Sequence, residues 1–269
     1  MSTLPLIIGH RGAAALAPEN TLAAFRRALD DGADGIEFDV RLARDQVPVV
    51  IHDASLSRTA QVDRLVSELT SEELQQLDAG SWFARALPTS PMSFSNERIP
   101  TLSDLLEFFT KNKGLMYLEM KSDNDQDNGI LPAEVARHLQ KYSVLDRVVV
   151  ESFDLSSIER IKRIDDRIRT AALFEPKLTR PISTLKRLKM IDLTLACGAN
   201  EIALHHTLVS SRLVERAQRA DLATVVWTVD RPSWLERAEL LGIDALIKNN
   251  PAKLVRHRNN TQANATRRR

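Results

Sequence analysis

Short apolar runs alternate with amphipathic stretches along almost the whole 269-residue chain, and this alternation constrains the fold most. The runs predict strands near residues 6–9, 35–39, 115–119, 147–151, 169–174, 200–204, 223–228 and 243–247. Helical patterns lie between most of them. In the first helix, Asn20 or Thr21 is a suitable N-cap and Gly32 follows the C-terminus. Eight strands alternating with helices predict the α/β class, as a (β/α)8 TIM-type barrel.

Two segments interrupt the alternation. The run VPVVI at 47–51 follows the second strand too closely for a helical crossover, so it predicts an antiparallel hairpin that turns at Asp45-Gln46. This turn places residue 52 opposite residue 39, so we expect His52 to face Asp39 above the barrel mouth. Residues 54–98 are polar and predict a small insertion at the barrel rim, with one helix capped by Thr70 or Ser71. We expect this insertion to cover part of the active site.

The rest of the chain is expected to form one barrel domain, residues 1–255. The tail 256–269 contains no apolar residue larger than alanine, so we expect it to be disordered. The N-terminal sequence lacks the basic region of a signal peptide, and no window approaches the roughly 20 apolar residues of a membrane span. The formal net charge of +1 gives no case for nucleic-acid binding, and the lone Cys197 excludes an internal disulfide. We therefore expect a cytoplasmic protein with a small-molecule substrate.

Acidic side chains lie at the C-terminal ends of the predicted strands, where barrels of this kind place their active sites. Glu37 and Asp39 are two residues apart on the second strand, so their side chains point the same way. Glu119 ends the third strand. Three carboxylates in this arrangement suit one hard cation, so they predict a site for Mg²⁺, Ca²⁺ or Mn²⁺ rather than Zn²⁺.

Basic residues complete the predicted site. Three carboxylates and a divalent cation sum to about −1, and Arg11 with Lys121 brings the total to about +1, which attracts a phosphodiester. Arg11 can hold two phosphate oxygens, while Lys121 acts as a point charge. His10 and His52 can serve as general acid and base on opposite sides of a phosphorus atom. The pattern predicts a metal-assisted phosphoester hydrolase.

Several segments together resemble the glycerophosphodiester phosphodiesterase family. The resemblance covers nearly the whole chain to about residue 254, and it is carried in order by GHRGAAALAPENTLAAF (9–25), GADGIEFDVRLARDQVPVVIHDASLSRT (32–59), IPTL (99–102), LEMK (118–121), SFD (152–154), VWTVD (226–230) and GIDALI (242–247). It implies an α/β barrel with a small insertion after the histidine–aspartate motif. It also implies cleavage of substrates such as glycerophosphocholine or glycerophosphoethanolamine to glycerol 3-phosphate and an alcohol.

The resemblance also implies a role for each site residue. His10 and His52 form the acid/base pair, and Arg11 and Lys121 hold the phosphate. The metal ligands are Glu37, Asp39 and Glu119. Trp227 packs beside the glycerol or alcohol part of the substrate, with plain core packing as the alternative. Departures from the family pattern at Gln46, Glu151 and Lys248-Asn249 are expected to leave these positions untouched.

Two other functions stay open at this point. One is a lysophospholipase D-like hydrolase on the same site, for which Trp82, Phe83 and Phe94 of the insertion are the candidate apolar surface. The other is a non-catalytic phosphodiester- or metal-binding protein.

Two further groups of residues are weaker site candidates. Asp123, Asp125 and Asp127 with Glu134 have the spacing of a calcium loop, but Asn128 replaces its glycine. His205 follows the sixth strand, where we expect a surface or capping role rather than a place in the pocket.

Overall fold

A computed structural model of the chain describes residues 4–86, 94–121, 129–176 and 184–267. Eight parallel strands pair in the order β1-β9-β8-β7-β6-β5-β4-β2, and pairing of β1 with β2 closes the barrel. The barrel strands are β1 (Leu6–Gly9), β2 (Gly35–Leu42), β4 (Leu115–Met120), β5 (Val148–Ser152), β6 (Arg169–Phe174), β7 (Glu201–His205), β8 (Ala223–Trp227) and β9 (Ala245–Lys248). The predicted (β/α)8 barrel is confirmed.

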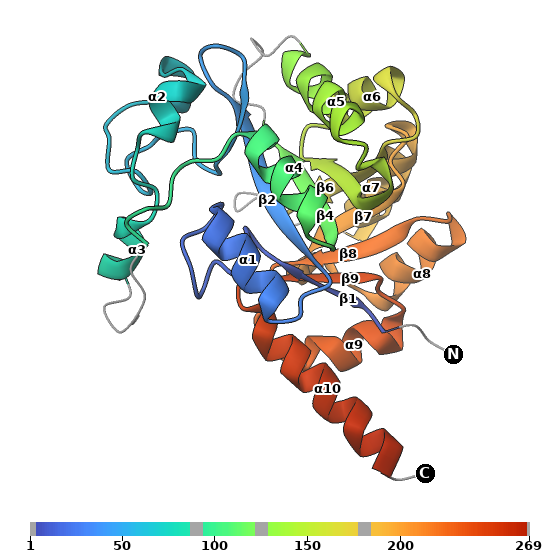
Figure 1. The fold of residues 1–269 in the computed structure, drawn as a ribbon. Helices are drawn as coiled ribbons and strands as arrows, with labels where there is room; N and C mark the ends of the chain where they lie inside the picture. Colours follow the sequence, from blue (N-terminus) through green and yellow to red (C-terminus); the bar gives the residue numbers. More distant parts are fainter. Residues whose placement is uncertain (1–3, 87–93, 122–128, 177–183, 268–269) are drawn as a thin grey trace.

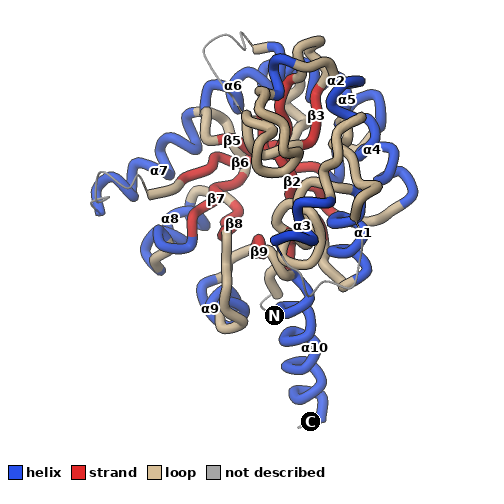
Figure 2. The backbone as a smooth tube through the Cα atoms, turned by 90° about the vertical axis from the view of Figure 1, so that its left-hand side faces the viewer, coloured by secondary structure: helices blue, strands red, loops and turns tan. Residues whose placement is uncertain are grey.

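Helices surround the strands, as Figures 1 and 2 show. The described helices are α1 (Leu22–Asp30), α2 (Ser71–Gln75), α3 (Ser81–Ala86), α4 (Leu102–Lys111), α5 (Ile130–Tyr142), α6 (Leu155–Ile164), α7 (Thr184–Ala196), α8 (Ser211–Arg219), α9 (Trp234–Leu241) and α10 (Pro251–Arg267). Thr21 caps α1 by accepting a hydrogen bond from the Ala24 amide, and Gly32 follows its C-terminus at φ 86°, both as expected. None of the helices in the described ranges is long and apolar enough to cross a membrane.

Strand side chains alternate between the barrel interior and the helix layer. Outward residues of β2, such as Phe38, pack in the core shared with α1 and α4. Inward apolar residues form a separate cluster, with members from every barrel strand except β2: Ile8, Tyr117, Val149, Ala171, Leu173, Ala203, Val225, Ala245 and Ile247. At its inward positions β2 instead carries Glu37 and Asp39. Because both strand faces are buried, the strands read as nearly continuous apolar runs, which explains why they could be predicted.

The hairpin after β2 is confirmed, but the predicted register is wrong by one residue. β3 (Pro48–Val50) pairs antiparallel to β2 with Val50 opposite Val40, so residue 39 pairs with residue 51 rather than 52. The Ala43 amide donates to the Val47 carbonyl, which leaves a three-residue turn, 44–46. Gln46 adopts φ 62° at the third position, where such turns place a left-handed residue. The side chain of Gln46 gives no signal for that conformation, so the longer turn could not be predicted.

Residues 54–86 and 94–98 pack on one side of the barrel around α2 and α3, beside β2 and α1 (Figure 1). Thr70 caps α2, as expected, and it also forms a capping box with Glu73. Buried Leu56, Val66 and Leu74 pack against the β2–β3 hairpin. The described part of segment 54–98 therefore shares a small apolar core with the hairpin.

The C-terminal segment differs from the disordered tail expected for 256–269. Residues 256–267 continue α10, which projects from the barrel in Figure 1. Leu254 and Val255 are buried, and Arg258 pairs with Asp34 at 2.6 Å, so the first turns of α10 are fixed on the barrel. Once a helix is nucleated, adding residues costs little, so the polar continuation needs no apolar face of its own.

Two glutamates lie inside the barrel besides those of β2 and β4. Glu201, at the start of β7, accepts a hydrogen bond from Tyr117 and pairs with Arg169. Glu151 on β5 is 1% exposed, and its Oε2 has no hydrogen-bond partner. Burial, followed by the negative charges of Glu37 and Glu119, raises the pKa of Glu151 well above its usual range. The ionised form of Glu151 therefore destabilises the metal-free fold.

The Glu151→Gln variant should remove the cost of burying an ionisable carboxyl group while keeping the shape of the side chain. The pKa of Glu151 is higher in the folded state than in the unfolded state. The free energy of unfolding of the wild type is therefore greatest at a pH below the unfolded-state pKa, and it decreases as the pH rises toward the folded-state pKa. We expect the variant to gain about 1–3 kcal/mol in free energy of unfolding at pH 8 and much less at pH 5. Urea titrations in EDTA measure this, with exposed Glu215→Gln as the control. Equal gains at both pH values would contradict the account.

Candidate active site

The C-terminal strand ends surround a cavity of about 510 Å³. Seven of the eight predicted site residues line it, and they are His10, Arg11, Glu37, His52, Glu119, Lys121 and Trp227. The eighth, Asp39, lies directly behind this lining and contacts it through Arg11 and Lys121. The barrel thus brings together residues that are up to 217 positions apart in the chain.

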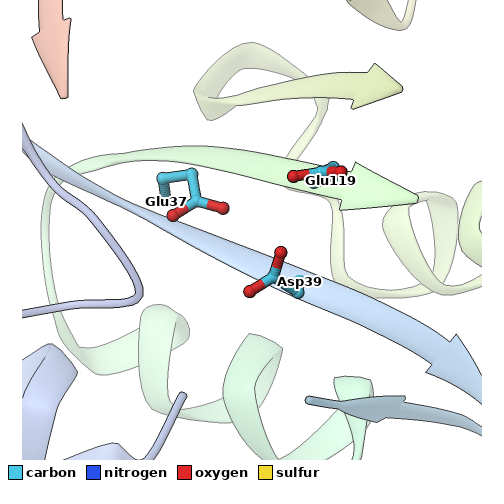
Figure 3. Close-up of side chains that lie close together, drawn as sticks. All are labelled: Glu37, Asp39 and Glu119. Carbon is cyan, nitrogen blue, oxygen red and sulfur yellow. The ribbon is translucent and has the colours of Figure 1, made fainter. Parts of the chain in front are cut away.

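Three carboxylates converge from two neighbouring strands (Figure 3). Glu37 and Asp39 come from β2, and Asp39 lies opposite Glu119 in the register of β2 with β4. One oxygen of each carboxylate lies within 4.8 Å of the others, and all three residues are at most 7% exposed. Glu37 and Asp39 therefore point to the same side of β2, as the sequence predicts.

The carboxylates hold more negative charge than the neighbouring cations balance. Lys121 Nζ lies 3.1 Å from Asp39 Oδ1 and 2.6 Å from Glu119 Oε1. Burial opposes ionisation of Asp39, but Lys121 and Arg11 outweigh it and lower the pKa of Asp39. Burial and the charge of Asp39 raise the pKa of Glu119 to about 7, and burial also raises that of Glu37. A hard divalent cation fits this all-oxygen donor set and would supply the missing positive charge.

Asn20 orients Asp39, a role that sequence reasoning missed. Its Nδ2 donates to Asp39 Oδ2 at 2.8 Å, and its Oδ1 accepts from the Asp39 amide at 3.3 Å. Asn20 is buried and adopts φ 59°, a left-handed conformation that asparagine tolerates better than most residues. Asn20 was one of two N-cap candidates; Thr21 takes the cap, and Asn20 instead fixes a carboxylate of the cluster.

Arg11 is bound on several sides. Its amide donates to Glu37 Oε2 at 2.8 Å, and its Nε lies 3.4 Å from Asp39 Oδ2. Its Nη1 donates to Glu19 Oε1 at 2.8 Å. Glu19 therefore reaches the site through Arg11 rather than by lining the cavity, and it limits where the guanidinium can point.

Asn249 contacts a predicted catalytic residue, which corrects the expectation that the departures at 248–249 leave the site untouched. Asn249 Oδ1 lies 2.5 Å from His10 Nδ1, and His10 Nε2 lies 3.8 Å from Glu37 Oε2. Burial and the positive charge of Arg11 lower the pKa of His10 to about 4. A barrel must close to bring residues 10 and 249 together, so sequence spacing could not reveal the contact.

His52 reaches the cavity despite the shifted register. Its Nδ1 lies 2.6 Å from Asp53 Oδ1, and Arg41 Nε donates to the His52 carbonyl at 2.7 Å. Burial lowers the pKa of His52, while the charge of Asp39 opposes that shift. Since Nδ1 is bonded in both His10 and His52, Nε2 is the nitrogen available for proton transfer.

Aromatic side chains form another part of the cavity wall. The ring of Trp227 lies edge-to-face with Phe153, with centroids 5.6 Å apart, and with His205 at 5.2 Å. Trp227 therefore both packs on its neighbours and lines the cavity. His205 accepts from the Thr207 amide and so caps the following turn, as expected.

Two other predictions concern the surroundings of the cavity. None of the described residues of segment 54–98 lines the cavity, so the cover expected from this insertion is absent from the described part of the chain. Asp123, Asp125 and Asp127 lie outside the described residues.

Known proteins share both the sequence pattern and the fold. Residues 10–253 match the model of the glycerophosphoryl diester phosphodiesterase family. A glycerophosphodiester phosphodiesterase of Caldanaerobacter subterraneus is 32% identical over 250 residues, covering 93% of this chain and 96% of its own. An Oleispira antarctica phosphodiesterase, solved with the product sn-glycerol-3-phosphate, has a TM-score of 0.82 and 26% identity, with coverage of 95% and 97%. The glycerophosphodiester phosphodiesterase of Agrobacterium tumefaciens has a TM-score of 0.76 and 27% identity, with coverage of 93% and 99%. By sequence and fold, this chain belongs to the glycerophosphodiester phosphodiesterase family of enzymes.

Proposed function

We propose that this chain hydrolyses glycerophosphodiesters, such as glycerophosphocholine and glycerophosphoethanolamine, to glycerol 3-phosphate and an alcohol. The observation that carries the proposal is the cluster of three buried carboxylates within 4.8 Å of one another, in contact with a cavity that two histidines also line. The product bound to the Oleispira antarctica phosphodiesterase supports the same product here.

Glu37, Asp39 and Glu119 would hold one Mg²⁺, Ca²⁺ or Mn²⁺ ion. When bound, such an ion orients substrate oxygens and stabilises the charge of the transferring phosphoryl group. Asn20 keeps Asp39 in place through two hydrogen bonds. Without an ion, the Lys121 ammonium group lies against Asp39 and Glu119 and balances part of their charge; a bound ion would take over this role and free Lys121 for the phosphate.

Arg11 and Lys121 would bind the substrate phosphate. Both line the cavity, and both are mostly buried, with side chains 17% and 14% exposed. A guanidinium can grip two phosphate oxygens, whereas an ammonium group acts as a point charge. Partial exclusion of water strengthens both attractions to the anionic substrate.

His10 and His52 would transfer the protons. One Nε2 would take a proton from the nucleophile and the other would donate a proton to the departing alcohol oxygen. With water as the nucleophile, glycerol 3-phosphate forms directly; with the adjacent glycerol hydroxyl, a cyclic phosphate forms first, and water then opens it to glycerol 3-phosphate. An alkoxide is a poor leaving group, so the proton-donating histidine contributes most for such substrates. The wall of Trp227 and Phe153 would pack against the organic part of the substrate.

The lysophospholipase D-like alternative needs an apolar surface for an acyl chain. Of the three aromatic residues suggested for that surface, Phe83 and Phe94 are 3% and 5% exposed and pack with Ala17 and Ala24, whereas Trp82 is half-buried. One partly exposed ring is a small surface for an acyl chain, which favours a water-soluble diester over a lipid.

Purified protein should release glycerol 3-phosphate from glycerophosphocholine in the presence of Mg²⁺, Ca²⁺ or Mn²⁺. EDTA should abolish the reaction, and His10→Ala should lower kcat by at least about 100-fold because it removes one proton-transfer group. His257→Ala on α10 is the matched control and should leave the rate unchanged. Enzymatic detection of glycerol 3-phosphate provides the assay. Cleavage of lysophosphatidylcholine but not of glycerophosphocholine would favour the lipid alternative. No detectable cleavage of either substrate would favour a binding protein.

Cation binding should depend on the buried carboxylates. Asp39→Asn and Glu119→Gln should each weaken the binding of Mn²⁺ by at least about tenfold, since each removes a charged oxygen ligand. Isothermal titration calorimetry of the metal-free protein measures the affinity, with the exposed Glu215→Gln as control. Wild-type affinity in both cluster variants would show that the ion binds elsewhere.

A further inference from the structure

Arg58 lies outside the cavity but contacts the partners of two residues inside it. Its Nη1 and Nη2 donate to the two oxygens of Glu19, at 2.8 and 2.6 Å. Its Nε donates to Asp53 Oδ2 at 2.6 Å. Neither Arg58 nor these two acids line the cavity. One guanidinium therefore binds two carboxylates from separate loops.

Each of these acids holds a residue of the proposed site. Glu19 Oε1 also accepts from Arg11 Nη1 at 2.8 Å, so the Arg58–Glu19 contact continues to the proposed phosphate-binding arginine. Asp53 Oδ1 lies 2.6 Å from His52 Nδ1, so the Arg58–Asp53 contact continues to a proposed catalytic histidine. Hydrogen bonds from Arg58 and His52 outweigh burial and lower the pKa of Asp53 to about 2, which keeps this acid ionised.

Contacts within segment 54–98 also hold Arg58 in place. Leu56, two residues earlier, is fully buried in the core of this segment, and its amide donates to the Arg64 carbonyl. The guanidinium carbon of Arg58 lies 5.7 Å from the centre of the Trp82 ring, a cation–π distance. Trp82 in turn packs edge-to-face on buried Phe83. Segment 54–98 thus holds Arg58 in two ways: nearby Leu56 anchors the chain, and Trp82 contacts the guanidinium group.

We propose that Arg58 is a positioning residue that sets Arg11 and His52 in a fixed relation to each other, and that the described part of segment 54–98 acts on catalysis through Arg58. The proposal rests on the proposed function. Only arginine fits the position, since its planar fork reaches both carboxylates at once, whereas a lysine ammonium group is a single point. A lysine at position 58 would keep the positive charge beside Glu19 and Asp53, so replacing Arg58 with lysine separates the geometry of the contacts from their charge.

Arg58→Lys keeps the charge and loses the fork. Because Arg11 and His52 both lose their support, we expect KM for glycerophosphocholine to rise and kcat to fall, with kcat/KM lower by about 10- to 100-fold. Binding of Mn²⁺ should stay at the wild-type level, since Arg58 contacts none of the cation ligands. Arg64→Lys is the matched control in the same segment, because Arg64 is similarly exposed and pairs only locally with Glu68. It should behave as wild type.

Double-mutant cycles separate positioning from a merely structural role. Glu19→Gln should mainly raise KM, and Asp53→Asn should mainly lower kcat. Combining either with Arg58→Lys should cost no more than about twofold beyond Arg58→Lys alone, since residues of one network are not additive. Additive losses, or normal kcat/KM in Arg58→Lys, would overturn the proposal. If Arg58→Lys fails to fold, the two single acid variants still carry the test, because near-normal kinetics in both would overturn it.

A binding measurement distinguishes this proposal from the proposed function. Calorimetry of the Mn²⁺-loaded protein with sn-glycerol 3-phosphate needs no turnover. Weaker binding in Arg58→Lys together with an inactive wild type would support the positioning role and reject the phosphodiesterase assignment. Normal turnover and normal binding in Arg58→Lys would leave the assignment standing and reject the positioning role.

Discussion

The mutual repulsion of three buried carboxylates is the constraint on which the rest of the site depends. Glu37, Asp39 and Glu119 lie within 4.8 Å of one another inside a barrel whose other interior residues are mostly apolar. Burying such charges is unfavourable unless cations and hydrogen-bond donors surround them. Lys121, Arg11 and Asn20 supply part of this compensation. A divalent ion would supply the rest, so we interpret the cluster as a binding site rather than as a contribution to stability.

Much of the fold and site could be predicted because both follow from simple periodicities. Buried parallel strands appear in the sequence as apolar runs, and the period of two along β2 places Glu37 and Asp39 on the same side. The C-terminal strand ends of a barrel share one rim, which brings His10, Lys121 and Trp227 into one cavity. The shared orientation of Glu37 and Asp39 could therefore be predicted without knowledge of any loop structure.

The parts that could not be predicted depend on loop paths and on contacts made when the barrel closes. The left-handed Gln46 lengthens the hairpin turn and shifts its register, although nothing in a glutamine side chain signals that conformation. Asn249 meets His10, and Arg58 meets Glu19, only because distant rim segments lie side by side in the fold. The helical continuation of α10 was missed because its polar composition needs no burial once the preceding turns are docked.

Anomalous diffraction from crystals soaked in Mn²⁺ would show directly whether the three carboxylates hold the ion. We expect one strong peak within coordination distance of Glu37, Asp39 and Glu119, with the Lys121 ammonium group displaced from the carboxylates that it contacts when no ion is bound. The peak should vanish in crystals of Asp39→Asn. A cluster without a peak, in a protein that still cleaves glycerophosphodiesters, would contradict the assignment of these carboxylates as the metal site.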